Sequence, residues 1–188
     1  MHRIVLPGEP LIDGPTALRP WRDTDVAALA NACRDPDIAR WTPVPEHYGE
    51  SDARAFLLQR YDAISAGAAA LFAVVAAMDT SRVLGSVALM HFAWEHARAE
   101  GGYWLAREAR GQGHATRALK LICAWGFKTL RLERIDLLAA TENPDSQRVA
   151  ERAGFTREAT LRSYRRGKDG RLDMVAFGLL RTDRPLTS

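Results

Sequence analysis

The sequence predicts an α/β fold with a mixed, mostly antiparallel sheet of about six or seven strands flanked by about four helices. Apolar residues make up 47% and charged residues 26% of the 188 residues, as in globular proteins of one domain. No internal repeat, low-complexity tract or linker divides the chain, so we expect a single domain over 1–188 with a core at about 16–180. The expected elements follow the order strand, two helices, three strands, helix, strand, helix and two strands. This order does not alternate regularly enough for a doubly wound parallel sheet.

In the first half of the chain, cap and turn residues set the expected boundaries. Asp23-Thr24-Asp25 offers N-cap chemistry for a first helix, and Ser51 or Asp52 does so for a second. Segment 41–49 contains prolines and aromatic residues and is expected to be a loop, while 79–82 has the composition of a hairpin turn. The strands expected here lie at 16–19, 70–78 and 83–92.

In the second half, proline and glycine mark the ends of elements. Asn143-Pro144 begins a short helix, because proline at the first helical position needs no amide donor, and Gly154 ends that helix. Asp169-Gly170 is a tight-turn dipeptide between the last two strands. The elements expected here are strands at 101–106, 135–140, 155–161 and 172–180, and an amphipathic helix at 115–128.

The segment Arg110-Gly111-Gln112-Gly113-His114-Ala115 links the expected strand to the helix after it. A strand that turns through glycines into a helix presents free backbone N–H groups and the positive end of a helix dipole, which together form an anion site, usually for phosphate. The glycines let the backbone approach the ligand closely. Four basic side chains in or near the loop add donors for a pyrophosphate or a ribose phosphate: Arg107, Arg110, His114 and Arg117.

Two common nucleotide-binding loops do not fit this segment. A P-loop needs the pattern G-x-x-x-x-G-K-[ST], which nothing here supplies. A Rossmann loop needs a third glycine where Thr116 stands, and it would come early in the chain rather than after several strands.

The pattern [Q/R]-x-x-G-x-[G/A], met by residues 110–115, resembles the coenzyme A pyrophosphate loop of the GNAT family of N-acetyltransferases. A second element, Asn143-Pro144-Asp145-Ser146 leading to 150–155, resembles the family's N-x-x-S…E-x-x-G-F signature. Segments 18–25 and 102–105 look like the branch that includes the RimJ/RimL-type ribosomal-protein N-terminal acetyltransferases. The resemblance covers about 16–180 and implies the GNAT fold, acetyl-coenzyme A (acetyl-CoA) as cosubstrate, and no metal.

The resemblance also implies roles for particular residues. In the family the strand before the loop splays from its neighbour, so unpaired backbone groups of Trp104, Leu105 and Ala106 would bind the pantetheine arm and polarise the thioester carbonyl. Asn143 would contact the pantetheine, and Ser146 would hydrogen-bond the departing thiolate; the alternative for both is helix capping alone. The loop and the helix start would hold the pyrophosphate through Arg110, Gly111, Gln112, Gly113, His114, Ala115 and Thr116.

The base that removes the proton of the amine is the least defined part of the expected site. A primary alkylamine titrates near ~10, so at neutral pH a base or a water chain must take its proton. In the ribosomal-protein branch a glutamate lies near the final hairpin, and its counterpart here is Arg165. Glu100, at the start of the cofactor-binding strand, is the best remaining carboxylate, ahead of Asp136 and Glu142. A water relay without any single base, and an exposed strand-end charge at Glu100, are the alternatives.

The expected reaction transfers acetyl from acetyl-CoA to a primary amine by direct attack in a ternary complex. The amine belongs to a protein N-terminus or to a small molecule, and the sequence leaves that choice open. Six side chains line an acceptor cleft or else pack in the core and loops: Trp41, His47, Tyr48, His91, Trp94 and Tyr164. A basic run attracts an acidic acceptor or cofactor phosphates, or forms a solvated hairpin: Arg162, Arg165, Arg166, Lys168 and Arg171.

The composition and the hydropathy of the chain indicate in which compartment the protein works and which partners it binds. The chain start lacks the apolar stretch of a signal peptide, and no apolar run reaches the ~20 residues of a membrane span, so we expect a cytoplasmic protein with no membrane partner. A net charge of +3 is too small to indicate nucleic-acid binding by itself. Cys123 is expected to be a small buried side chain on a helix. A homodimer rests on the resemblance alone.

Two other functions stay open at this point. The first is a non-catalytic acyl-CoA-binding sensor or interaction module of the same fold, which Arg165 in the place of the glutamate keeps under consideration. The second is an RNA- or ribosome-binding domain that uses the hairpin arginines, although the chain contains no dedicated nucleic-acid motif.

Overall fold

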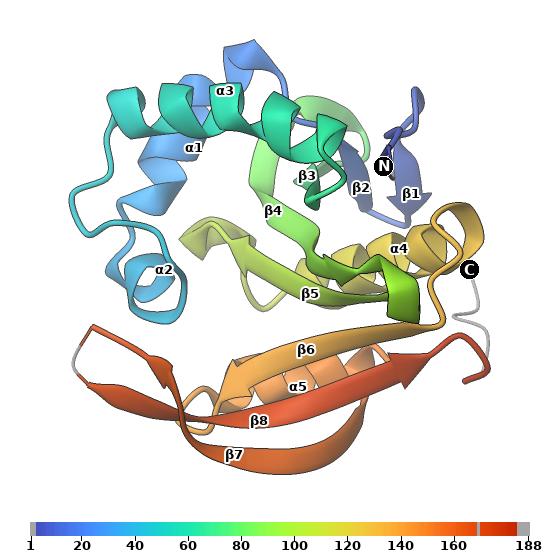
Figure 1. Ribbon diagram of the computed structural model, residues 1–188. Helices are drawn as coiled ribbons and strands as arrows, with labels where there is room; N and C mark the ends of the chain where they lie inside the picture. The colour runs from blue at the N-terminus through green and yellow to red at the C-terminus, as the bar shows by residue number, and fades with distance from the viewer. Residues whose placement is uncertain (1–2, 169, 184–188) are drawn as a thin grey trace.

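The computed structural model describes residues 3–168 and 170–183. These residues form one eight-stranded sheet with the order β1-β2-β3-β4-β5-β6-β8-β7 (Figure 1). Every neighbouring pair of these strands is antiparallel except β5 and β6, which are parallel, so the predicted fold class is confirmed. The strands are β1 (Leu11–Asp13), β2 (Thr16–Pro20), β3 (Ala69–Ala76), β4 (Asp79–Ala93), β5 (Arg98–Leu105), β6 (Arg134–Ala140), β7 (Thr156–Arg166) and β8 (Arg171–Leu180).

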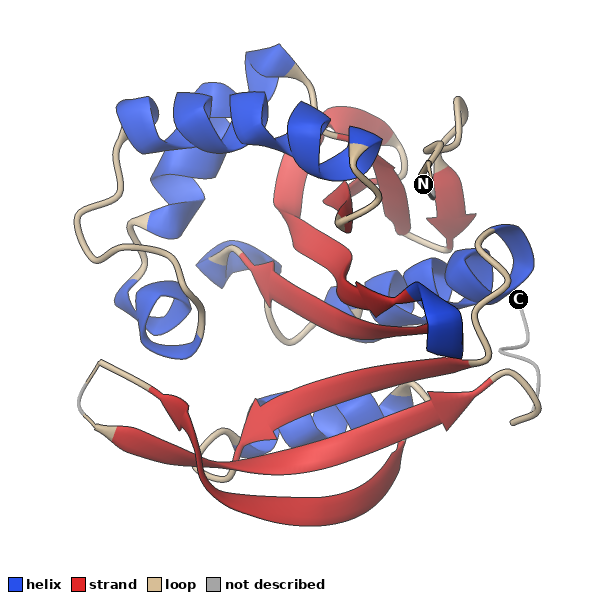
Figure 2. Cartoon of the chain, viewed as in Figure 1, coloured by secondary structure: helices blue, strands red, loops and turns tan. Residues whose placement is uncertain are grey.

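Helices lie on both faces of this sheet (Figure 2). The side chains of β2 and β3 alternate between two apolar clusters, as the two-residue period of a strand requires. Leu18 and Phe72 pack in the cluster that includes α4 and α5, whereas Ala17 and Ala73 pack in the cluster that includes α1 and α3. The helices are α1 (Val26–Cys33), α2 (Pro36–Trp41), α3 (Glu50–Ser65), α4 (His114–Thr129) and α5 (Pro144–Arg152).

The parallel pair β5 and β6 separates part of the way along the sheet. Its register runs from Arg98 opposite Arg134 to Gly101 opposite Leu137 and then stops. β5 continues to Leu105 and β6 continues along β8 to Ala140, so the two strands diverge beyond their last pair. This divergence exposes one backbone edge of β5 immediately before the glycine loop.

Two short elements escaped prediction. β1 has three residues, too few to show a two-residue period, and it pairs only with β2. α2 has six residues and begins at Pro36, behind the carboxylate of Asp35, which accepts the N–H of Asp37 at 3.0 Å. The Asp35-Pro36 pair is a sequence pattern typical of a helix N-terminus and could have predicted α2. Trp41, which was expected in a loop, is the last residue of α2.

Two predicted boundaries in the first half of the chain are wrong. The second predicted helix is α3, and it begins at Glu50 rather than after Ser51 or Asp52. Asp52 is instead the third residue of α3, and its carboxylate accepts the N–H of Gly49 at 2.9 Å. The turn between β3 and β4 falls at 77–78, so 79–82 belongs to β4. The predicted turn dipeptide Asp169-Gly170 includes Asp169, which lies outside the described residues.

The turn composition of 79–82 nevertheless has a structural role, because the register of β3 and β4 shifts there. Val75 lies opposite Val83 and Ala76 lies opposite Asp79, so β4 carries extra residues in a bulge. The carboxylate of Asp79 accepts the N–H of Ser81 at 3.0 Å within this bulge. Turn-forming residues therefore serve a bulge here.

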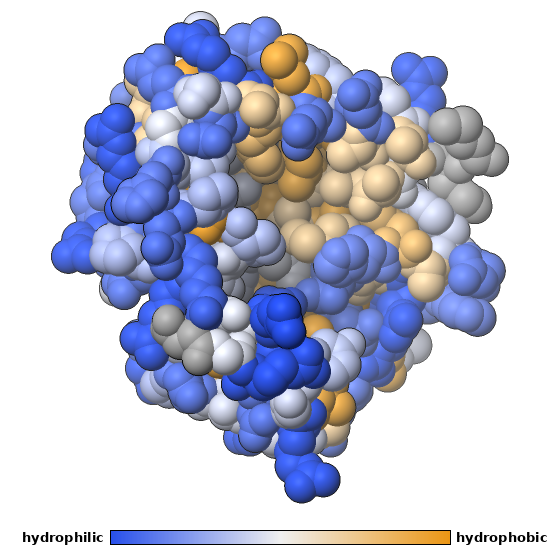
Figure 3. Space-filling view, turned by 60° about the vertical axis from the view of Figure 1, so that its left-hand side comes forward, coloured by the Kyte–Doolittle hydropathy of each residue, from blue (hydrophilic) through white to orange (hydrophobic). Residues whose placement is uncertain are grey.

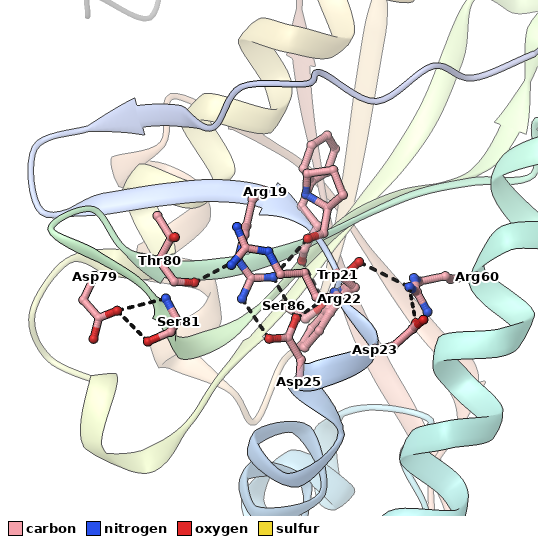
Figure 4. Close-up of polar contacts among 12 residues, drawn as sticks. Arg19, Trp21, Arg22, Asp23, Asp25, Arg60, Asp79, Thr80, Ser81 and Ser86 are labelled. Atoms are coloured by element: carbon pink, nitrogen blue, oxygen red, sulfur yellow. Dashed lines mark hydrogen bonds and ion pairs between the residues drawn. The ribbon is translucent and has the colours of Figure 1, made fainter.

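A buried ion pair fixes the start of α1 (Figure 4). Arg19 on β2 makes a bidentate contact with Asp25, at 2.7 and 2.8 Å, and also donates to the Thr80 carbonyl at 2.9 Å. Asp25 accepts the N–H of Arg22 at 2.8 Å. Asp23-Thr24-Asp25 forms a short 3-10 turn before α1, and Asp25, the N-cap of α1, makes no side-chain hydrogen bond to that helix. The predicted N-cap hydrogen bond is therefore wrong, because the Asp25 carboxylate bonds Arg19 and the Arg22 N–H instead.

Cys33 and Cys123 are both buried, which confirms the prediction for Cys123. Burial raises the pKa of Cys33 to about 12, so its thiol stays protonated at neutral pH. No helix in 3–168 or 170–183 is long and apolar enough to cross a membrane.

Candidate active site

The end of β5 carries the first group of predicted cofactor-binding residues. The N–H of Ala106 donates to the Leu84 carbonyl at 2.9 Å, and the Ala106 carbonyl accepts from the N–H of Ala109 at 2.9 Å. The expectation of unpaired backbone groups is therefore wrong for Ala106. Both of its polar groups are used inside the chain, and they hold the end of β5 against β4.

The alternation of an antiparallel ladder decides which amides are free. Hydrogen-bonded pairs alternate with non-bonded pairs, and Trp104 lies two residues before Ala106, opposite Ser86. The polar backbone groups of Trp104 therefore also face β4, and its side chain packs against Trp21 with ring centroids 6.4 Å apart. The amides of Tyr103 and Leu105 point to the other edge, which β6 has left.

The glycine loop follows this edge and leads into α4. Gly111 and Gly113 have φ values of 75° and 79°, in the left-handed region that favours glycine. Gly113 is the N-cap of α4, so the amides of the first helical turn have no partners within the helix. Arg117 lies across the loop and donates to the Gln112 carbonyl at 3.0 Å. The loop thus has the backbone form that an anion site requires.

The side chain of Arg110 ties this loop to α2 rather than extending freely from it. Its guanidinium contacts Asp35 at 2.8 Å and Asp37 at 3.0 Å, and it donates to the Leu105 carbonyl at 3.2 Å. Arg107 also contacts Asp35, at 3.3 Å. Two of the arginines predicted as phosphate donors are therefore engaged by carboxylates in this conformation.

His114, the first residue of α4, directs its side chain into the core. Its Nδ1 lies 2.8 Å from the hydroxyl of Thr16 on β2. Burial lowers the pKa of His114, with the positive charges of Arg117 and Arg82 acting in the same direction. His114 therefore offers its backbone N–H to the loop while its neutral ring joins α4 to the sheet.

The second predicted element, the start of α5, lies across the divergence from β5. The side chain of Asn143 accepts the N–H of Ser146 at 3.1 Å, so Asn143 is the N-cap. The hydroxyl of Tyr103 donates to Ser146 Oγ at 3.1 Å. Burial raises the pKa of Tyr103 to about 12, although the Ser146 hydrogen bond opposes the shift, so Tyr103 remains protonated and can donate. Tyr103 was not among the residues predicted for the site. Its position two residues before Leu105, and so on the same side of the strand, could have indicated it.

Glu100 lies between two basic side chains. Its carboxylate is 3.1 Å from Nδ1 of His91 on β4 and 3.5 Å from the guanidinium of Arg165 on β7. The side chain of Glu100 is 21% exposed and that of Arg165 is 38% exposed, so solvent reaches the pair. The residue that stands in the place of the expected glutamate therefore contacts the best remaining carboxylate.

The two weaker carboxylate candidates are bound in other ion pairs. Asp136 contacts Arg134 at 2.6 Å and Arg98 at 3.3 Å. Glu142 lies 3.8 Å from Arg40, with both side chains largely exposed. Asp136 nevertheless lies directly opposite Glu100 in the parallel register of β5 and β6, whereas Glu142 contacts neither Ser146 nor Glu100.

The six aromatic and histidine residues proposed for an acceptor cleft have different environments. Tyr48 is buried in the core with α1 and α3. Trp94 donates to the Gly67 carbonyl at 3.0 Å and stacks on Phe92, with ring centroids 4.4 Å apart. Arg40 lies over the ring of Trp41. His47, His91 and Tyr164 are exposed.

The hairpin of β7 and β8 approaches the helical half of the molecule at one place. Lys168 donates to the Val44 carbonyl at 3.3 Å and lies 3.6 Å from Glu46. Figure 3 shows this face hollowed, with apolar residues in the hollow and hydrophilic residues along the side of the hairpin. Lys168 therefore joins the final hairpin to the segment that follows α2.

Comparison with known proteins agrees with this arrangement. The model of the acetyltransferase (GNAT) domain matches residues 16–156. The uncharacterized N-acetyltransferase p20 of Bacillus licheniformis is 28% identical over 166 residues, which are 88% of this chain and 93% of that protein.

Solved structures share the fold. A ribosomal-protein-S5-alanine acetyltransferase from Vibrio fischeri superposes with a TM-score of 0.82 at 22% identity, covering 93% of this chain and 98% of that one. A spermidine N-acetyltransferase from Vibrio cholerae, in complex with CoA and spermine, gives 0.77 at 24% identity, covering 91% and 98%. The chain belongs to the GNAT acetyltransferase family and is an acetyl-CoA-dependent N-acetyltransferase.

Proposed function

We propose that this protein transfers the acetyl group of acetyl-CoA to a primary amine by direct attack in a ternary complex. The observation that carries the proposal is the divergence of β5 from β6, which leaves free amides beside the Tyr103–Ser146 hydrogen bond and leads straight into the glycine loop. The thioester and the phosphates of acetyl-CoA therefore have backbone donors along one edge. The departing thiolate has a proton donor at the same edge.

Binding of the cosubstrate would use backbone groups at both ends of this edge. The amides of Gly113, His114, Ala115 and Thr116 would take the pyrophosphate, with Gly111 and Gln112 shaping the loop. The amides of Tyr103 and Leu105 would hold the pantetheine arm, and one of them would stabilise the oxyanion, an effect of about 3 kcal/mol in comparable sites. Asn143 would act by holding the start of α5.

In the reaction, the amine nitrogen attacks the thioester carbonyl carbon and forms the new C–N bond. The tetrahedral oxyanion then collapses, the C–S bond breaks and the sulfur leaves with the electron pair. Ser146 gives its proton, or a hydrogen bond, to the sulfur, while Tyr103 donates to the Ser146 oxygen and so directs the serine proton away from itself. The nitrogen loses its proton to Glu100, directly or through water.

The similar proteins indicate the chemical class of the acceptor but not its identity. The solved structures of similar fold include enzymes named for a ribosomal protein and for spermidine, both of which present amines. A primary amine is therefore the common feature that we carry to this chain. The acyl-CoA sensor that the sequence left open is the alternative outcome of the turnover test below, since Arg165 replaces the expected glutamate.

The cofactor site is tested by a matched pair of substitutions at Gly113. Asparagine and aspartate have the same shape and both tolerate a positive φ, so they differ mainly in charge. We expect Gly113→Asp to abolish acetyl-CoA binding in isothermal titration and Gly113→Asn to retain weakened binding. Equal affinity of the two variants would place the pyrophosphate elsewhere.

Catalysis is tested by thiol release from acetyl-CoA over a panel of peptides and small amines. Release above background hydrolysis that depends on Ser146 supports the transferase. Tight binding without release from any amine would favour the sensor.

A further inference from the structure

Two β-bulges aim basic side chains at Glu100. On β4, Met90 lies opposite Glu100 and Ala93 lies opposite Arg98, so β4 uses three residue steps where β5 uses two. His91 sits in this bulge with a φ of 52°, unusual for a residue with a side chain. The bulge turns its ring toward the Glu100 carboxylate, at 3.1 Å.

The bulge on β7 is larger and is held by its own contacts. Leu161 lies opposite Met174 and Arg165 lies opposite Leu172, so β7 uses four steps where β8 uses two. Ser163, inside this bulge, has a φ of 51°. Its N–H donates to Asp173 at 2.6 Å, and Arg171 donates to its hydroxyl at 3.0 Å and to its carbonyl. The strain at Ser163 is therefore supported from β8 and places Arg165 toward β5.

The guanidinium of Arg165 has N–H donors that its contact with Glu100 does not use. A guanidinium carries five N–H donors in a planar fork, and Arg165 makes one long contact of 3.5 Å with Glu100. By comparison, the guanidinium of Arg110 makes two carboxylate contacts of 2.8 and 3.0 Å. Because the side chain is partly exposed, a carboxylate arriving from solvent can pair with the unused face.

We propose that the acceptor bears a carboxylate a few bonds from its reacting amine, and that Arg165 binds this carboxylate. The inference rests on the proposed function, because it places the amine beside Glu100. The shared chemistry is an acidic group next to a primary amine, as in an acidic amino acid or a peptide whose first residue is acidic. Arg165 thereby replaces a proton acceptor of related enzymes with a specificity residue.

The charge of the hairpin supports an acidic acceptor over a polycationic one. Among the described residues, β7, β8 and the turn between them carry six cations: Arg157, Arg162, Arg165, Arg166, Lys168 and Arg171. The described carboxylates of this hairpin are already engaged, since Asp173 accepts the N–H of Ser163 and Glu158 pairs with Arg134. Glu100 likewise contacts His91 and Arg165. A polyamine would meet repulsion here, whereas an anionic acceptor would be attracted.

The test measures kcat/KM by thiol release for matched acceptors: a dipeptide with N-terminal aspartate, the same dipeptide with asparagine, free aspartate, and spermidine. We expect the aspartyl dipeptide or free aspartate to exceed the asparaginyl dipeptide by at least about 10-fold, and spermidine to be the poorest. The comparison of dipeptide with free amino acid separates the two sources of the same chemistry.

Variants locate the preference at Arg165. Arg165→Gln should remove the aspartate-over-asparagine ratio, and Arg165→Glu should invert it, whereas Arg157→Gln, which removes a charge from an exposed site on the same strand, should leave it unchanged. Circular dichroism and acetyl-CoA affinity show whether each variant is folded.

Two outcomes overturn the inference and leave the transferase in place: equal rates for the aspartyl and asparaginyl dipeptides, or an Arg165→Gln variant that slows both equally. If no amine in the panel or in a wider set is acetylated, the proposed function itself fails, and the inference falls with it.

Discussion

The guanidinium of Arg165 on β7 lies 3.5 Å from the carboxylate of Glu100 on β5, across two intervening strands of the sheet. A substitution that removes the expected glutamate is thus linked in space to another carboxylate. In the proposed mechanism, the pair provides a carboxylate beside the amine and a positive charge next to that carboxylate. The proposed acceptor preference rests on this contact between Arg165 and Glu100.

The hydrogen bond from Tyr103 to Ser146 predicts a non-additive effect on turnover. Ser146→Ala should lower kcat about 100-fold, as loss of a proton donor does. Tyr103→Phe should lower kcat about 10-fold, because the serine oxygen loses its donor and the serine proton is no longer directed. The measurement is steady-state thiol release at saturating acetyl-CoA.

The double variant Tyr103→Phe/Ser146→Ala is the control for this prediction. If Tyr103 acts through Ser146, the double variant turns over at the rate of Ser146→Ala alone. Multiplication of the two single effects would show that Tyr103 works independently, and the positioning role would be abandoned.

The contact between Arg110 and Asp35 predicts that a residue outside the loop controls cofactor affinity. Arg110→Ala and Asp35→Asn should each weaken acetyl-CoA binding about 10-fold, because each releases the loop from α2. Titration calorimetry of the two single variants and the double variant measures the coupling. An Asp35→Asn variant with unaltered affinity would indicate that Arg110 leaves Asp35 to contact phosphate directly.

The sequence predicted correctly those features that depend on a few neighbouring residues. The strand–glycine loop–helix of 101–128 and the Asn-Pro start of α5 needed only local signals, and both are present. The pairings that aim His91 and Arg165 at Glu100 depend on bulges, and a bulge is a property of two strands in register rather than of either sequence. A one-residue change in register would turn both side chains elsewhere.

Local patterns were also insufficient for hydrogen-bond direction. Trp104, Leu105 and Ala106 were grouped as equivalent, yet the bond from Ala106 to Leu84 sets an alternation that directs the polar backbone groups of Trp104 and Ala106 to β4 and those of Leu105 away from it. The Leu105 carbonyl accepts from Arg110, so its N–H is the group that this alternation leaves for a ligand. The same alternation adds Tyr103 to the site. Only the pairing partner, β4, supplies that information.

The lowered pKa of His114 predicts a pH dependence of stability. An exposed histidine in the unfolded chain titrates near ~6.5, whereas burial and then the charges of Arg117 and Arg82 lower the pKa of the folded state. The unfolded chain therefore binds the proton more readily. This contribution to stability is complete above about pH 6.5 and is lost as the pH falls through the window below it.

Urea unfolding at a series of pH values from 8 to 5 measures this effect. His114→Asn keeps a group near the Thr16 hydroxyl but does not titrate, so it should flatten the decline, whereas His47→Asn on an exposed loop should not. A decline that is the same in wild type and His114→Asn would assign the pH dependence to other groups.

The buried Arg19–Asp25 pair predicts a large asymmetry between breaking one partner and removing both. The two side chains are 2% and 5% exposed, so Arg19→Met leaves a buried, uncompensated carboxylate. We expect a loss of about 3–5 kcal/mol in the free energy of unfolding. Arg19→Met/Asp25→Leu should recover part of that loss, since no charge then remains buried.

The exposed pair Arg54–Glu50 on α3 is the matched control. Its side chains are 64% and 55% exposed, so Arg54→Met should change stability by less than about 0.5 kcal/mol. If Arg19→Met and Arg54→Met proved equally mild, the pair would be a replaceable contact and the start of α1 would be fixed by packing alone.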